Sequence, residues 1–187
     1  MAKTMADFQN AGRHAVVRTD LLDGTDVRAN LVSVMIDEDL GEVDNGNFVT
    51  VKELTDKAPH DHSGVNRTVY KAEKPGADDG IKKMVLIASP EVNYDERKKN
   101  LDDFTNEVGT IARGYILEAR NIFSVTPEAF TAESAVAGDS LDSLIGSAVG
   151  VGAGATKLVV GGTANVIGKI VDINYTTRHA YIGIQVD

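Results

Sequence analysis

The sequence predicts a mainly β fold, a small sandwich or barrel with one short helix and an extended N-terminal arm. Short runs of β-branched and apolar residues alternate with clusters of turn-forming residues along the whole chain. Helical 3.6-residue periodicity is almost absent, which argues against a helical or α/β fold. The 187 residues, 42% of them hydrophobic, suffice to bury a core. We therefore expect an arm at residues 1–13 and a single β-rich domain at residues 14–187.

The predicted strands are short and follow one another closely. Most of them alternate apolar and polar residues, which is typical of a strand with one buried face. Residues 84–88 form a continuous apolar run, which predicts a strand buried on both faces. The last two runs are separated by polar residues and predict a hairpin that closes a sheet. The predicted strands comprise residues 15–18, 29–36, 68–72, 84–88, 110–117, 121–125, 157–160, 165–173 and 180–186.

Turn signals separate these runs. Asn45 and Gly46 stand between apolar residues, and this pair favours a type I′ turn, which needs two residues that tolerate positive φ. Residues 57–66 contain Pro59 and Gly64 and predict a loop. Residues 74–80 form another turn cluster.

Four segments do not fit the strand pattern. Residues 1–13 are polar and unpatterned, and we expect them to form an arm that becomes ordered on a neighbour. Residues 91–108 are highly charged and are compatible with a helical turn or with an extended excursion. Thr126 followed by Pro127 is a helix start signal and predicts one short helix. Residues 138–155 are rich in Gly, Ser and Ala and predict a loop or a weak strand against a close neighbour.

Composition excludes several classes of function. The chain has 19 Lys and Arg against 28 Asp and Glu, a net charge of −9, so we expect no nucleic-acid partner. The absence of cysteine excludes disulfides, thiolate catalysis and Cys-ligated zinc. We expect no signal peptide and no membrane partner, because no window approaches the roughly 20 apolar residues of a bilayer span. The absence of Trp and the 5% aromatic content disfavour a sugar-binding cleft, although the many carboxylates leave a glycosidase pair open.

Two acidic or histidine-containing segments were weighed as metal sites. His-Asp-His at residues 60–62 could place two imidazoles near one metal, but we can name no third distant ligand. Asp-Glu-Asp at residues 37–39 could bind calcium through oxygen atoms, but the segment lacks the spacing and glycine of an EF-hand loop. We therefore predict a solvated loop and a charged strand end, and no metal site.

Residues 152–157 superficially resemble a phosphate-binding loop, but Lys157 opens a β-branched run instead of a helix. No Gly-x-Ser-x-Gly elbow occurs, and only His14 and His179 lie near predicted strands, where we expect them to pack at the surface or half-buried. The sequons at Asn66 and Asn174 are chance matches on a chain expected to stay in the cytosol. We predict no catalytic residue and no cofactor.

Three consecutive segments resemble phage structural proteins from Gram-positive hosts. Residues 84–97 read MVLIASPEVNYDER, residues 101–106 read LDDFTN, and residues 111–115 read IARGY. In that group, a buried strand, a Tyr-Asp-Glu segment, an Asp-Phe-Thr stretch and an Ala-Arg-Gly-Tyr or Ala-Arg-Ala-Tyr strand follow in this order. The Gly/Ala-rich segment 138–155 departs from the pattern. Shorter similarities occur at residues 42–50, 121–126 and 168–171.

The resemblance implies a capsid decoration, or cement, protein of a tailed phage. Such a subunit is made in the host cytoplasm, binds the outside of the major capsid protein lattice and stabilises the head. It implies no catalytic residues. We expect a homo-oligomer, with dimer and trimer equally open, and we expect residues 1–18, 91–108 and 138–155 to reach neighbouring subunits. The alternatives are another virion component, such as a tail-tube, minor head or major capsid subunit, or a small β-barrel enzyme or binding module.

Overall fold

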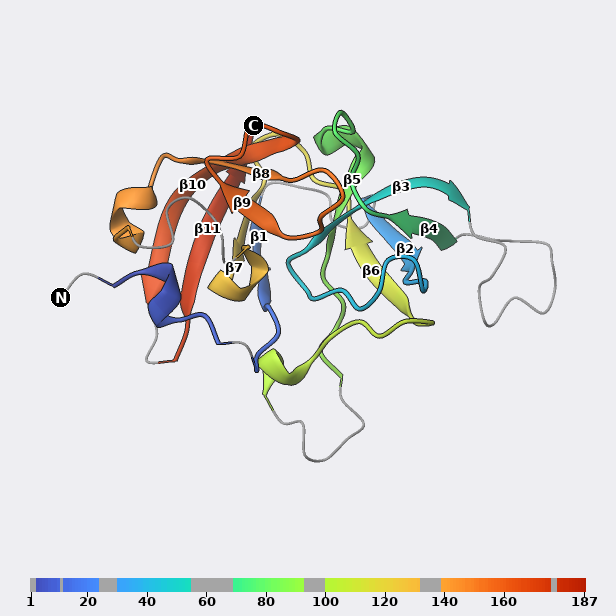
Figure 1. The fold of residues 1–187 in the computed structure, drawn as a ribbon, viewed down its shortest axis with the longest axis horizontal. Coiled ribbons are helices and arrows are strands. Elements are labelled where there is room, and N and C mark those ends of the chain that lie inside the picture. Colours follow the sequence, from blue (N-terminus) through green and yellow to red (C-terminus); the bar gives the residue numbers. More distant parts are fainter. Residues whose placement is uncertain are drawn as a thin grey trace.

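A computed structural model describes residues 3–10, 12–23, 30–54, 69–92, 100–131, 139–175 and 178–187, with the backbone alone for residues 19–23. The fold is mainly β and consists of a six-stranded antiparallel sheet beside a closed five-stranded barrel (Figure 1). In the part of the chain that the structure describes there is no α-helix, only short 3-10 helices. The predicted fold class is therefore confirmed.

The barrel is formed by five strands that are consecutive in the chain. It closes because β6 pairs with both β5 and β2. The strand order is β2-β4-β3-β5-β6, and only the β2–β4 pair is parallel. The strands are β2 (Leu31–Met35), β3 (Phe48–Leu54), β4 (Val69–Glu73), β5 (Met84–Ile87) and β6 (Ile111–Tyr115).

The sheet takes one strand from before the barrel and five from after it. Its order is β1-β7-β11-β10-β8-β9. The predicted hairpin is confirmed, because β10 and β11 pair antiparallel from Gly168 with Val186 to Tyr175 with Ala180. This hairpin lies in the middle of the sheet. The strands are β1 (Val17–Asp23), β7 (Ile122–Val125), β8 (Ala148–Val151), β9 (Leu158–Val160), β10 (Val166–Tyr175) and β11 (Ala180–Val186).

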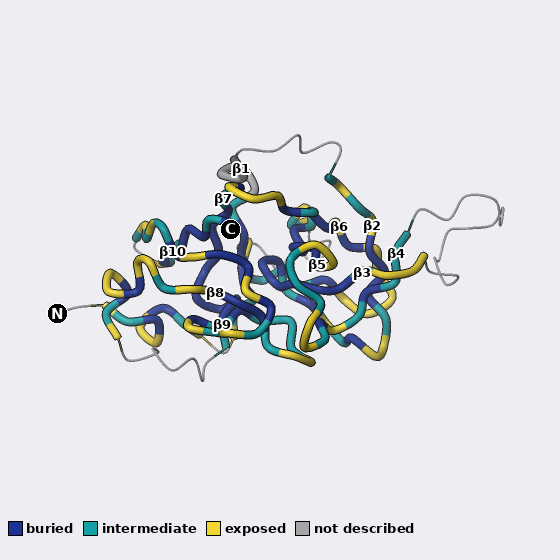
Figure 2. The backbone as a smooth tube through the Cα atoms, turned by 90° about the horizontal axis from the view of Figure 1, so that it is seen from above, coloured by how far each residue is buried: buried dark blue, intermediate teal, exposed yellow. Residues whose placement is uncertain are grey.

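Strand β5 joins the two hydrophobic clusters of the molecule. Val85 and Ile87 lie in the cluster inside the barrel, whereas Met84 and Leu86 lie in the larger cluster that covers the sheet. All four residues of β5 are buried, as predicted for the apolar run 84–88 (Figure 2). Alternation along one strand thus gives the barrel and the sheet a shared wall.

Residues 3–10 of the predicted arm pack on the chain's own sheet. Met5 is fully buried and Phe8 is nearly so, and both belong to the sheet cluster. The Leu141 N–H donates to the Lys3 carbonyl at 2.8 Å, and Thr4 forms a bridge with Ser140. The side chains of Met5 and Phe8 fill part of the sheet core, and their burial holds this segment in place. The 3-10 helices are η1 (Met5–Asp7), η2 (Ile81–Lys83), η3 (Leu101–Asp103), η4 (Pro127–Ala129) and η5 (Leu141–Leu144).

Local predictions differ from the structure at two sites. The turn at Asn45 and Gly46 forms, but only Gly46 has a positive φ, so the type I′ prediction is wrong. The short helix predicted after Thr126 is the single 3-10 turn η4, with Pro127 at its first position. One turn is all that fits, because Phe130 next bridges to Leu158 at the edge of the sheet.

Of the two structures predicted for residues 138–155, a loop or a weak strand against a close neighbour, the strand is confirmed. Residues 139–155 contain η5 and strand β8, which lies between β10 and β9. Although this segment is rich in small residues, it contributes three large apolar side chains to the sheet core: Leu141, Leu144 and Val149. Glycine at Gly150 is required because a Cβ there would lie 2.4 Å from the Ala164 carbonyl oxygen.

Strand β1 ends at Asp23, five residues beyond its predicted end, and the other predicted strands are found with boundaries shifted by at most two residues. Within the charged segment 91–108, the described residues form η3 and no long helix. The loop predicted at residues 57–66 lies outside the described residues. No helix in the described part of the chain has the length and apolar character needed to cross a bilayer.

Candidate functional site

An open groove with a volume of about 840 Å3 lies on the outside of the barrel. Its lining includes the outward-facing residues of β2 and β6, which are paired strands. Val34 and Ala112 belong to the barrel core, and Leu31, Ser33, Ile111 and Arg113, which alternate with the core residues, line the groove, whose lining also includes Val32 and Ala112. Two further segments complete the lining: residues 89–92, which follow β5, and residues 104–107, which follow η3.

Large apolar side chains are exposed in this groove. Leu31, Val92 and Ile111 are 37%, 59% and 40% exposed, and Phe104 lines the groove beside them. Contiguous exposed apolar surface on a small protein commonly marks a site for a protein partner. The groove therefore has the character of a docking surface.

One cation and one anion line the same groove. Arg113 in β6 and Glu107 in the turn before it are both exposed. Neither side chain makes an ion pair or a side-chain hydrogen bond with the residues that the structure describes. The backbone around Arg113 is well held, since its N–H donates to Ser89 Oγ at 3.0 Å and its carbonyl accepts from Ala88. Strand β6 and the turn before it thus present two charged groups that have no partner among the described residues.

Asn45 connects the two segments beside the groove. Its side-chain nitrogen donates to the Ser89 carbonyl at 2.9 Å and to Glu91 Oε1 at 3.2 Å. Its side-chain oxygen accepts from the Ser89 N–H at 2.9 Å and from Asn106 Nδ2 at 3.2 Å. Asn45 is fully buried, and its side-chain amide acts both as a hydrogen-bond donor and as an acceptor. The groove is therefore pre-organised by a buried polar network.

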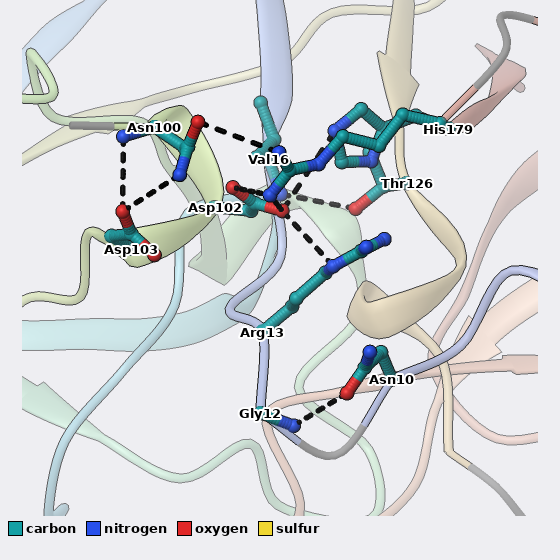
Figure 3. A network of polar contacts seen from close by, with 10 residues as sticks. Asn10, Gly12, Arg13, Val16, Asn100, Asp102, Asp103, Thr126 and His179 are labelled. Carbon is teal, nitrogen blue, oxygen red and sulfur yellow. Dashed lines mark hydrogen bonds and ion pairs between the residues drawn. The ribbon is translucent and has the colours of Figure 1, made fainter. Parts of the chain in front are cut away.

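A second polar cluster surrounds Asp102 in η3 (Figure 3). The buried carboxylate accepts two hydrogen bonds from Arg178 Nη2, at 3.0 and 2.8 Å, and lies 3.3 Å from Arg13 Nε. His179 Nε2 lies 3.8 Å from the same carboxylate. These contacts tie the segment before β1, η3 and the segment before β11 together. A buried carboxylate is tolerated here because two guanidinium groups pair with it.

The surroundings of His179 lower the pKa of its imidazole. Burial lowers its pKa from the usual value, while Asp102 and Glu128 oppose that shift and Arg13 and Arg178 add to it. The distance of 3.8 Å from Asp102 is too long for the hydrogen bond that orients a catalytic imidazole. The geometry is that of a structural clamp.

Glu128 in η4 carries an unpaired buried carboxylate. The residue is 6% exposed, and neither side-chain oxygen has a hydrogen-bond partner among the residues that the structure describes. Lys157, which lies close by, donates instead to the Glu128 main-chain carbonyl at 3.1 Å. Such a group destabilises a fold unless something else compensates it.

Of the two segments considered as metal sites, His60 and His62 lie outside the described residues. Asp37, which we predicted to belong to a charged strand end, follows β2, accepts from the Leu40 N–H at 3.2 Å and lies 3.9 Å from Lys71. Within the described ranges, no group of three His, Asp or Glu residues has the geometry to bind a metal.

The other candidates occupy structural positions. Residues 152–157 form the connection between β8 and β9, and Lys157 opens no helix. His14 Nδ1 lies 2.7 Å from Asp44 Oδ1, near the Asp102 cluster but bound to a different carboxylate. Asn66 lies outside the described residues, and Asn174 lies within β10.

The sequence analysis missed the residues that define the groove. Leu31 and Ile111 occur in ordinary strand patterns, and nothing in those patterns indicates that their outward faces adjoin. Glu107 and Arg113 fall within or beside the segments that resemble phage proteins, and only that resemblance distinguished them. The pairing of β2 with β6 brings them together, across about 80 residues of chain.

Comparison of the chain with protein-family models, with curated proteins and with solved structures gave no match.

Proposed function

We propose that this chain is a virion structural protein, a capsid decoration subunit that binds the outside of a major capsid protein lattice and stabilises the head. On this proposal the chain has no reaction to catalyse. Its function is to hold protein subunits together, and each contact adds free energy to the assembled state alone.

One observation carries the proposal. The three segments that resemble phage structural proteins, residues 84–97, 101–106 and 111–115, all contribute to the lining of the groove. The residues that carry the resemblance therefore include exposed residues of the groove as well as residues of the core. A surface of this kind suits recognition of another protein.

Charge and architecture agree with this function. With a net charge of −9, the chain is repelled by packaged DNA and suits the outer side of a shell. The barrel and the sheet share one wall and form a stiff body. The free-energy cost of ordering the chain on binding is therefore small.

The test uses assembled shells of the major capsid protein from the phage that encodes the chain. We expect the purified chain to co-sediment with shells up to a saturating ratio, and to raise the temperature at which the shells disassemble. A cryo-EM map of virions should then show its density outside a continuous shell. Density in the tail or inside the head, or failure to co-sediment, would overturn the proposal.

A further inference from the structure

We propose that a second copy of this chain occupies the groove on the barrel, in a two-fold symmetric dimer in which Arg113 of each copy pairs with Glu107 of the other. The inference rests on the proposed function, since it assumes that the groove is a subunit interface. It goes further by naming the subunit that binds there and the charges that orient it.

The apolar part of the groove provides affinity for a partner. Leu31, Val92 and Ile111 are all more than a third exposed and all line the same hollow. Burial of such side chains against a partner is favourable at about 25 cal/mol per Å2 of apolar surface removed from water. Apolar contact alone, however, does not select one partner.

The two charges indicate which partner fits. Glu107 precedes β6, Ile111 is its first residue, and Arg113 follows two residues later on the same face of the strand. Neither charged side chain has an ion-pair partner among the described residues of its own chain. An acidic partner would pair only with Arg113, and a basic partner would pair only with Glu107.

A second copy satisfies both charges at once. In a two-fold interface, residue i of one copy meets residue j of the other, and residue j meets residue i. A rotation axis that passes near Ile111 places each Arg113 near the other copy's Glu107 and buries the apolar residues between the two pairs. The two charges are therefore complementary to their copies across a two-fold axis, as such a dimer requires.

The experiment measures molar mass by light scattering after size-exclusion chromatography, over a dilution series in the micromolar range. The wild-type chain should show twice the monomer mass of 19.9 kDa and dissociate on dilution. Arg113→Glu and Glu107→Arg should each weaken the dimer at least about tenfold, because each places like charges together twice per interface. The double variant Arg113→Glu/Glu107→Arg should restore the wild-type affinity to within about threefold.

Two matched controls change the net charge equally on other surfaces. Lys169→Glu and Glu38→Arg alter exposed residues outside the groove and should leave the dimer affinity unchanged. Thermal melting followed by circular dichroism verifies that every variant is folded, so that a loss of the dimer cannot be caused by unfolding.

The proposal is overturned if the wild-type chain is monomeric throughout the series, if either single reversal leaves the dimer intact, or if the double variant fails to recover. These outcomes are separable from failure of the decoration function. A dimer that ignores assembled shells would refute decoration alone, whereas a monomer that binds shells would refute only this use of the groove.

Discussion

The His179 side chain lies at the edge of a carboxylate that two arginines already neutralise. Its pKa is lowered chiefly by burial, so the folded chain favours the neutral imidazole. The unfolded chain, with an ordinary histidine pKa near 6.5, takes up a proton more readily as pH falls. Stability from this group is therefore present above the unfolded pKa and is lost as pH falls through the folded pKa.

We expect the free energy of unfolding to fall less in His179→Gln than in the wild type as pH is lowered from about 7 to about 5. Urea denaturation at each pH measures it. The difference between the two proteins isolates His179 from the other titrating groups. Parallel pH profiles for the two proteins would show that His179 binds protons equally in the folded and unfolded states.

Glu128 is expected to destabilise the fold, because its carboxyl group is buried without a hydrogen-bond partner among the described residues. Replacement by methionine keeps a long side chain and removes the buried carboxyl group. We expect Glu128→Met to raise the free energy of unfolding at neutral pH by about 1–3 kcal/mol. Glu38→Met, at an exposed turn, should change it by less than about 0.5 kcal/mol. A marked loss of stability in Glu128→Met would instead mean that the carboxylate has a compensating partner.

Among the elements, the β10–β11 hairpin depends on one close approach. Gly168 pairs with Val186, and a Cβ at Gly168 would lie 1.9 Å from the Gln185 carbonyl oxygen and 2.7 Å from its carbon. Both neighbours are backbone atoms in the centre of the sheet and cannot move aside cheaply. Glycine at this position is therefore a structural requirement of the hairpin.

We expect Gly168→Ala to lower the free energy of unfolding by about 3 kcal/mol or more, measured by chemical denaturation. The matched control is Gly152→Ala, where the nearest atom to the added Cβ lies at 3.8 Å. That substitution should change stability by less than about 0.5 kcal/mol. Equal effects at the two glycines would contradict the close packing of β10 on β11.

At the scale of the whole molecule, the barrel and the sheet share their hydrophobic core. Phe48 of β3 and Phe123 of β7 are fully buried with ring centroids 5.8 Å apart, so an aromatic pair links the two units. The larger cluster also contains Met84, Leu86 and Tyr115 from the barrel. Neither unit can lose its structure without exposing part of the other.

We therefore expect a single unfolding transition in calorimetry. Phe48→Leu and Phe123→Leu should each lower its midpoint, and the double variant should reveal a coupling of about 0.5–1.5 kcal/mol. Two separate transitions, with Phe123→Leu shifting only one of them, would show that the units fold independently.

The sequence predicted much of the fold from local pattern. Residues 84–88 were predicted as a strand buried on both faces because β-branched and apolar side chains form a continuous run, and the structure confirms it. The β10–β11 hairpin was predicted from alternation. Composition left a loop and a weak strand open for residues 138–155, because it does not report the close approach to a neighbouring backbone that small residues such as Gly150 permit.

By itself, the sequence determined the β class, the position of most strands and the acidic charge, because these depend on side-chain type and on periodicity along the chain. Tertiary structure alone decided that the strands divide into a barrel and a sheet, that Met5 and Phe8 are buried, and that Leu31, Glu107, Ile111 and Arg113 share one surface. Those features depend on strand pairing between distant segments. Pairing of that kind is set by the packing of the whole core, and a local pattern carries too little information to specify it.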